Sequence, residues 1–118
     1  MHRFRNLNVY GRSLRFKKKV REITKLFPKD ELFGLTAQFR RAANSISLNI
    51  AEGAGNGSQK EFRRFLSYSI RSGYECVACI DIALINEYFD ESMHAGLDKE
   101  IHEMIAMLVG LQKSLHRK

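Results

Sequence analysis

The sequence is poor in residues that break helices or cross-link chains. Its 118 residues include one proline, no tryptophan and two cysteines. A proline interrupts the interior of a helix, so its near absence suits a helical protein. Two cysteines cannot build the dense disulfide framework of a small secreted domain. We expect both to be free thiols in a reducing cytoplasm.

Long hydrophobic runs are also missing. No apolar stretch approaches the ~20 residues that a helix needs to cross a bilayer. The most apolar stretch, residues 76–85, is short and contains Asp81. The first eight residues carry charge but no apolar segment typical of a secretory signal. We therefore expect one cytoplasmic domain over residues 1–118, without membrane contact and long enough to bury its own core.

Apolar residues recur at helical spacing in four segments, and no segment is typical of a strand. The recurring apolar residues, which are expected to face the core, include Phe16, Phe39, Leu66 and Ile101. The first two helices are expected over residues 8–27 and 35–52, the third over about 58–88 and the fourth from about 90 to 115. Pro28 follows the first segment and stops it. Four amphipathic helices joined by short connections predict an all-α fold, an antiparallel up-down-up-down four-helix bundle.

Residues at the helix ends support these boundaries. Gly53 stands where a left-handed C-terminal cap of the second helix is expected, because glycine adopts that conformation without a Cβ clash. Ser58 and Glu61 have the spacing of a capping box at the start of the third helix. Asp90 or Ser92 is expected to cap the fourth helix.

Basic residues are concentrated in one part of the chain. Residues 1–71 hold 16 Lys or Arg against 5 Asp or Glu, a net charge of +11, whereas residues 72–118 hold 4 against 8, a net −4. Such a surplus favours a polyanionic partner bound by salt-sensitive phosphate contacts. The alternative is a well-solvated surface that keeps the protein in solution. The candidate nucleic-acid-binding residues are Arg12, Arg15, Lys17, Lys19, Arg21, Lys25, Arg63 and Arg64.

A second polar set falls near the expected core stripes. Buried polar groups must be hydrogen-bonded, so we expect a network between helices that fixes helix register or a subunit contact. A pocket of carboxylates is the alternative. The members of this predicted network are Gln38, Arg41, Asn49, Glu52, Ser72 and Glu75. For Arg40 and Arg41, phosphate binding and pairing with nearby glutamates both stay open.

The middle of the chain also carries a specific series of residues. The series runs through Leu35, Gln38, Arg40-Arg41-Ala42, Ser45 and Asn49-Ile50-Ala51-Glu52-Gly53 to Phe62, Phe65-Leu66, Ser72 and Glu75. This pattern resembles the "four helix bundle protein" family, also called 23S ribosomal RNA intervening-sequence proteins, and the likeness spans nearly the whole chain. The resemblance implies an antiparallel bundle that assembles into a closed homo-oligomeric ring, typically a pentamer.

A related group is the accessory variability determinant of diversity-generating retroelements, a basic pentameric bundle that binds nucleic acid and a reverse transcriptase. This likeness implies a nucleic-acid partner, for which we expect RNA rather than DNA. It also implies the alternative of an adaptor that recruits a reverse transcriptase without touching nucleic acid. One departure is the loop at residues 53–57, which is Gly-Ala-Gly-Asn-Gly where many relatives have an aromatic residue and an arginine.

No catalytic or metal-binding constellation accompanies these features. Cys76 and Cys79 form a Cys-x-x-Cys inside the third helix without a second pair of ligands, so small buried thiols are expected rather than a zinc site. Glu91-Ser92-Met93-His94 is one Glu-x-x-His motif, whereas a di-iron bundle needs two. We therefore expect a non-enzymatic protein without a metal or cofactor.

Overall fold

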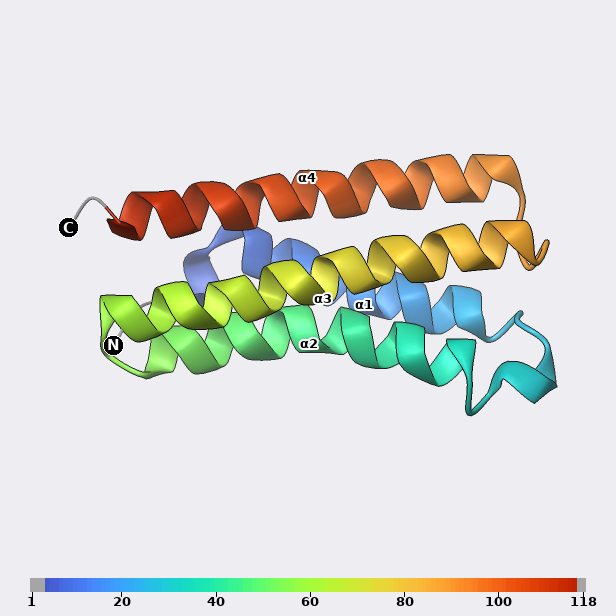
Figure 1. Ribbon diagram of the computed structural model, residues 1–118, viewed down its shortest axis with the longest axis horizontal. Helices are drawn as coiled ribbons and strands as arrows, with labels where there is room; N and C mark the ends of the chain where they lie inside the picture. The colour runs from blue at the N-terminus through green and yellow to red at the C-terminus, as the bar shows by residue number, and fades with distance from the viewer. Residues whose placement is uncertain (1–3, 117–118) are drawn as a thin grey trace.

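The computed structural model describes residues 4–116, and in this part of the chain four α-helices and no strands are present (Figure 1). The helices are α1 (Asn8–Thr24), α2 (Leu35–Gly55), α3 (Gln59–Ile85) and α4 (Glu91–His116), with short 3-10 helices η1 (Phe4–Asn6) and η2 (Lys29–Glu31). Contacts join α1 to α2, α2 to α3, α3 to α4 and α1 to α4, but no diagonal pair of these helices. The predicted antiparallel four-helix bundle is confirmed.

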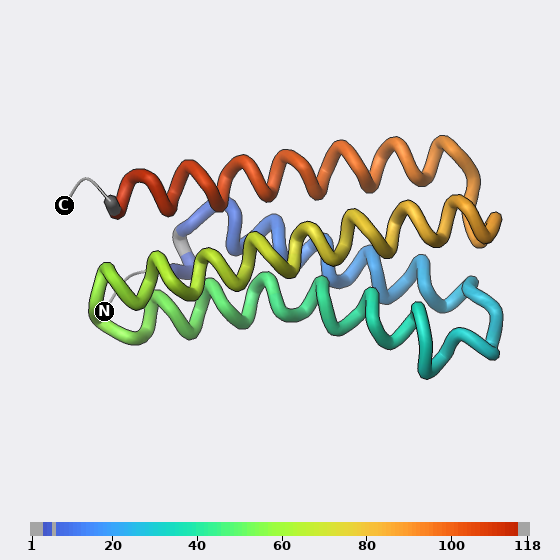
Figure 2. The backbone as a smooth tube through the Cα atoms, viewed as in Figure 1, coloured from blue at the N-terminus to red at the C-terminus, as the bar shows by residue number. Residues whose placement is uncertain are grey.

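The bundle is elongated, with extents of 46 × 24 × 19 Å. The α2–α3 turn lies at one end beside the last turns of α4, and the α1–α2 and α3–α4 connections lie at the other end (Figure 2). Of the neighbouring pairs, α1 and α4 approach each other least, so α1 is attached mainly through α2. None of the helices in the described residues is long and apolar enough to span a membrane.

Every helix turns an apolar stripe toward a common core. Phe16 of α1, Phe39 of α2, Leu66 of α3 and Ile101 of α4 are completely buried. All four belong to the stripes that the helical spacing predicts. Burying one side chain of this size contributes about 1.5–3 kcal/mol. The core therefore fixes which face of each helix is left for solvent and partners.

Two helices are three residues shorter than their periodicity predicts. Helix α1 ends at Thr24, and residues up to Phe27 continue in tighter three-residue turns because the residue before Pro28 disfavours the α conformation. Helix α3 ends at Ile85 because Glu87 is left-handed, with φ 61°. The N–H of Tyr88 then reaches back to Ala83 O at 2.9 Å, which is the pattern of a Schellman cap.

The prediction that Gly53 caps α2 in a left-handed conformation is wrong. Helix α2 continues through Gly53 to Gly55, and the left-handed glycine is Gly57, with φ 84°. A Cβ on Gly53 would lie 2.6 Å from Phe65 Cβ on α3. Glycine is needed at this position for the close approach of α2 and α3, rather than for a turn.

One half of the predicted capping box of α3 and the Asp90 cap of α4 are confirmed. Ser58 Oγ accepts a hydrogen bond from Glu61 N–H at 3.1 Å, which opens α3. Asp90 Oδ1 accepts from Met93 N–H at 2.8 Å and opens α4. The other half of the capping box, a return bond from Ser58 N–H to the Glu61 carboxylate, is not found in the described part of the chain, because this carboxylate pairs with Arg64 at 2.6 Å.

Candidate nucleic-acid interface

Helix α1 carries five of the predicted nucleic-acid-binding residues and Lys25 directly follows it, and three of these six form ion pairs. The pairs are Arg12–Glu103 at 3.0 Å, Lys19–Glu100 at 2.8 Å and Lys25–Glu22 at 3.1 Å. Two of the pairs join α1 to α4, which are the least closely packed pair of neighbouring helices. Exposed pairs of this kind contribute at most about 1 kcal/mol each. A phosphate that binds the N–H groups of these three residues nevertheless has to displace a glutamate carboxylate.

The other cations of α1 are exposed and unpaired. Arg15, Lys17 and Arg21 form no side-chain hydrogen bond or ion pair with the residues that the structure describes, and neither does Lys18. Lys18 is not among the predicted residues because it lies outside two series of basic residues spaced by three or four positions. These series are Arg12, Arg15, Lys19 and Lys17, Arg21, Lys25. Free ammonium and guanidinium groups on one helix face are available to a polyanion.

An open groove of about 580 Å³ runs between α1 and α2, and we call it the α1–α2 groove. Its lining residues are Leu14, Lys17, Lys18, Arg21, Arg40, Arg41 and Asn44. All five charged residues of this lining are basic. Five like charges along one groove repel one another, and the low-dielectric walls concentrate their field. The α1–α2 groove is therefore suited to an anion.

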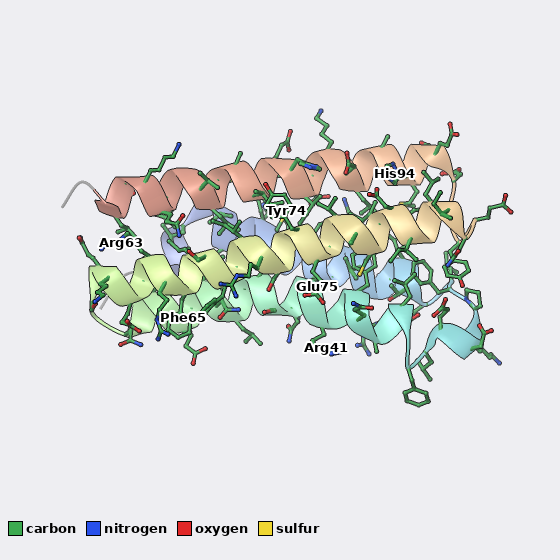
Figure 3. All side chains as sticks on the ribbon, viewed as in Figure 1. Arg41, Arg63, Phe65, Tyr74, Glu75 and His94 are labelled. Carbon is green, nitrogen blue, oxygen red and sulfur yellow. The ribbon has the colours of Figure 1, made fainter. Side chains whose placement is uncertain are left out.

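Both arginines whose role the sequence left open lie at this groove. Arg40 is half-buried, and its Nε donates a hydrogen bond to Thr24 Oγ1 at 2.8 Å. The side chain of Arg41 is exposed on the outer side of α2 (Figure 3) and forms no hydrogen bond or ion pair in the described part of the chain. Arg40 therefore has a partner on α1, whereas Arg41 is free.

Arg63 (Figure 3) and its neighbour in the chain, Arg64, lie elsewhere, in the first two turns of α3. Arg63 Nη1 donates to the carbonyl of Leu115 at 3.2 Å, in the last turn of α4. Arg64 pairs with Glu61 and lies over the ring of Phe65, 5.2 Å from its centroid. The hydrogen bond to Glu61 raises the pKa of Arg64. The structure does not bring either residue to the α1–α2 groove.

Two members of the predicted polar network meet between α2 and α3. Asn49 Nδ2 and Ser72 Oγ each donate to Ser45 Oγ at 2.9 Å. A second α2–α3 hydrogen bond, from Ser69 Oγ to Ile46 O at 2.9 Å, was not predicted because an isolated serine has no pattern. The side chains of the other four members are exposed and have no hydrogen bond or ion pair in the described part of the chain: Gln38, Arg41, Glu52 and Glu75. For these four, a role at a subunit contact stays a prediction.

Exposed apolar side chains gather at the end of the bundle opposite the α2–α3 turn. Leu26 is 82% exposed, Leu32 50% and Phe33 93%, all in the α1–α2 connection. Ile85, at the end of α3, is 80% exposed. Large apolar groups left in water in this way mark surfaces that contact other proteins. This second candidate surface is separate from the α1–α2 groove.

The two cysteines and the acidic and histidine side chains that could bind a metal do not line the α1–α2 groove. Cys76 and Cys79 are free and buried, as predicted. Burial raises the pKa of Cys76 and raises that of Cys79 to about 11, so both thiols stay protonated and unreactive. Among the described residues, one group of potential metal ligands is present, Asp81, His94 and Asp98, in which His94 Nε2 contacts Asp81 Oδ1 at 2.9 Å.

Together these features define a basic four-helix bundle with a groove on one side whose charged lining residues are all basic. The chain matches the family model of the 23S rRNA-intervening sequence protein over residues 5–110, and it belongs to that family. No curated protein matches the chain.

The bundle is also similar to the crystal structure of a protein with unknown function from the S23 ribosomal protein family of Bacteroides thetaiotaomicron. The two chains are 21% identical, with a TM-score of 0.82 over 89% of this chain and 95% of that chain. This likeness supports the fold.

Proposed function

We propose that this chain is a non-enzymatic, cytoplasmic RNA-binding protein that works as a homo-oligomer and contacts phosphates in the α1–α2 groove. The observation that carries the proposal is the lining of the groove, in which five basic side chains occur without an acidic one. Cations placed in this way give affinity for any phosphate backbone. The description of the family names 23S rRNA, which supports RNA over DNA.

The chemistry of the groove favours backbone contact over base reading. Its lining holds no aromatic side chain on which a base would stack. Lysine and arginine contacts to phosphate position a nucleic acid but carry no sequence information. Lys17 and Lys18 have flexible stems that adapt to different backbone shapes. We therefore expect binding that depends strongly on salt and weakly on sequence.

A homo-oligomer, for which the resemblance implies a pentamer, would multiply this weak affinity. Each chain has a net charge of +7, so copies in a ring present several grooves to one RNA molecule. Linked sites raise the overall affinity by about 10²–10⁴ without a new contact. The subunit number is measured as the mass in solution by light scattering, and a monomer at micromolar concentration would contradict this part of the proposal.

The test of the proposal is a salt titration. Fluorescence anisotropy of a labelled single-stranded RNA is followed at increasing potassium chloride, with a single-stranded DNA of the same sequence beside it. The logarithm of the affinity should fall linearly with the logarithm of salt, by about 0.7 per phosphate contact. If neither nucleic acid binds at low salt, RNA binding is ruled out.

A second candidate is an adaptor that recruits a protein, such as the reverse transcriptase that the resemblance implies. The exposed apolar residues at the α1–α2 connection favour it, because Phe33 is 93% exposed. Phe33→Ser would then abolish capture of a co-expressed reverse transcriptase and leave RNA affinity unchanged. If capture persists in the variant, Phe33 is not the contact.

A further inference from the structure

The side chain of Arg40 is held in place by a buried group on the neighbouring helix. Thr24 Oγ1, in a residue that is 2% exposed, donates to Val20 O at 2.7 Å. A threonine hydroxyl has one proton, and this bond uses it, so a lone pair is left for Arg40 Nε at 2.8 Å. The hydroxyl can then act toward Arg40 only as an acceptor. The guanidinium plane is therefore set by a residue in the core.

One edge of this guanidinium is occupied and the other is free. Nε donates to Thr24, and Nη2 approaches the carbonyl of Arg21 at 3.5 Å, which engages the side of the group that faces α1. A guanidinium carries five N–H groups, so its far edge keeps one N–H on each terminal nitrogen. Arg40 also lines the α1–α2 groove. A planar pair of donors matches two oxygens of one phosphate.

A purely structural role would explain part of this arrangement. Arg40 reaches the last turn of α1, where an arginine stabilises free carbonyl groups and the negative end of the helix dipole. That role does not account for Lys17, Lys18, Arg21 and Arg41 around the same groove. Their mutual repulsion opposes folding unless an anion neutralises it.

We propose that Arg40 is the preorganised phosphate receptor of the α1–α2 groove, that Thr24 is its positioning residue, and that the ligand is the phosphodiester backbone of a nucleic acid. This inference rests on the proposed function and names the residue pair on which that function depends. Fixing a guanidinium before binding removes the cost of ordering a long side chain, which corresponds to a gain in affinity of roughly two- to tenfold. Arg41, which has no such anchor, contributes charge without fixed geometry.

The test separates charge, geometry and anchoring in four variants, whose folding is checked by circular dichroism. Arg40→Gln should weaken binding of a labelled single-stranded RNA roughly tenfold and lower the salt slope by about one contact. Arg40→Lys should keep the slope and lose affinity, because a point charge replaces the fork. Thr24→Val should weaken binding roughly threefold at an unchanged slope. Thr24→Ser, which keeps the hydroxyl, should restore it.

Lys99→Gln is the matched control, because Lys99 is an exposed cation on α4 without an ion pair in the described part of the chain. It should keep the wild-type affinity. The inference is overturned if Arg40→Gln and Arg40→Lys bind RNA as tightly as the wild type. It is also overturned if Thr24→Ser loses as much affinity as Thr24→Val.

A second measurement does not depend on RNA. Inorganic pyrophosphate is titrated into the nitrogen-15-labelled protein, and the Nε–H signals of the arginines are followed by NMR. The signal that disappears in Arg40→Gln should shift first and saturate. A shift with pyrophosphate but no RNA binding would uphold the anion site and refute the proposed function. Binding of RNA with an unperturbed Arg40 signal would refute the site and uphold the function.

Discussion

Two pairs of adjacent arginines, Arg40-Arg41 on α2 and Arg63-Arg64 on α3, differ little as sequence and greatly as structure. Around the first pair, all charged lining residues of the groove are basic. In the second pair, Arg63 donates to a carbonyl of α4, and Arg64 pairs with Glu61 over an aromatic ring. The comparison teaches that a binding surface depends on free N–H groups without a carboxylate beside them, and the number of basic residues does not define it.

The physical reason is competition for donors. A phosphate at the second pair has to displace a carboxylate that is already at 2.6 Å from Arg64. At the α1–α2 groove it displaces water and relieves repulsion among like charges. We therefore expect variants of the two regions to affect different properties of the protein.

The largest expected effect is on RNA affinity. Lys17→Gln with Arg21→Gln removes two unpaired cations from the groove and should weaken RNA binding by about two orders of magnitude. The matched double variant, Arg63→Gln with Arg64→Gln, should change the affinity less than about threefold, because its charges are already engaged. Anisotropy at one fixed salt concentration compares both with the wild type. Equal losses in the two variants would remove the distinction between the regions.

The next effect is on stability and belongs to the turn where α2 meets α3. Gly53→Val forces a side chain against Phe65 and should lower the free energy of unfolding by about 1–3 kcal/mol. Gly55→Ala is the control, since a Cβ there meets nothing within 4 Å. It should be neutral or slightly stabilising. Urea unfolding measures both, and an unchanged midpoint for Gly53→Val would contradict the close approach.

A smaller effect on stability comes from the hydrogen bond that the Tyr88 hydroxyl donates to Glu31 of η2. Glu31 Oε2 accepts this bond at 2.6 Å. This bond, followed by one from Leu35 N–H, lowers the pKa of Glu31 below its ordinary 4.5. A carboxyl with a depressed pKa in the folded state stabilises the protein above the unfolded pKa. This stability is lost as the pH falls through the folded pKa, below about 4.5.

Thermal unfolding between pH 6 and pH 3 checks this prediction, provided that melting temperatures are determined to within about one degree. Tyr88→Phe removes the larger cause of the shift, so its melting temperature should fall less steeply with acid than that of the wild type. RNA binding at neutral pH should be the same in both, because Glu31 and Tyr88 do not line the α1–α2 groove. Parallel acid profiles would show that the bond does not contribute.

Much of the bundle could be predicted from local patterns. Helical spacing identified Phe16, Phe39 and Ile101 as core residues, and all are completely buried. The cap at Ser58 followed from its distance to Glu61, because capping uses neighbours in the chain. The left-handed cap predicted at Gly53 is wrong because the constraint on this glycine comes from Phe65 of another helix, which local patterns do not reveal.

The site was less predictable. Lys17 and Arg21 are predicted nucleic-acid-binding residues, and the structure places both in the α1–α2 groove. The sequence does not single out Lys18, and it leaves the role of Arg40 undecided. Arg12 and Lys19 were expected beside them, but glutamates of α4 pair with both. No sequence pattern relates residues that are about 80 to 90 positions apart, so these pairs could not be foreseen.

By itself the sequence determined the four helices, their buried faces and the excess of positive charge in residues 1–71. These properties depend on the order of residues along the chain, through helical periodicity and composition. The tertiary structure decided which cations are neutralised, which stay free, and that Thr24 orients Arg40. Pairing acts over a few ångströms in space, and only the packed bundle sets those distances.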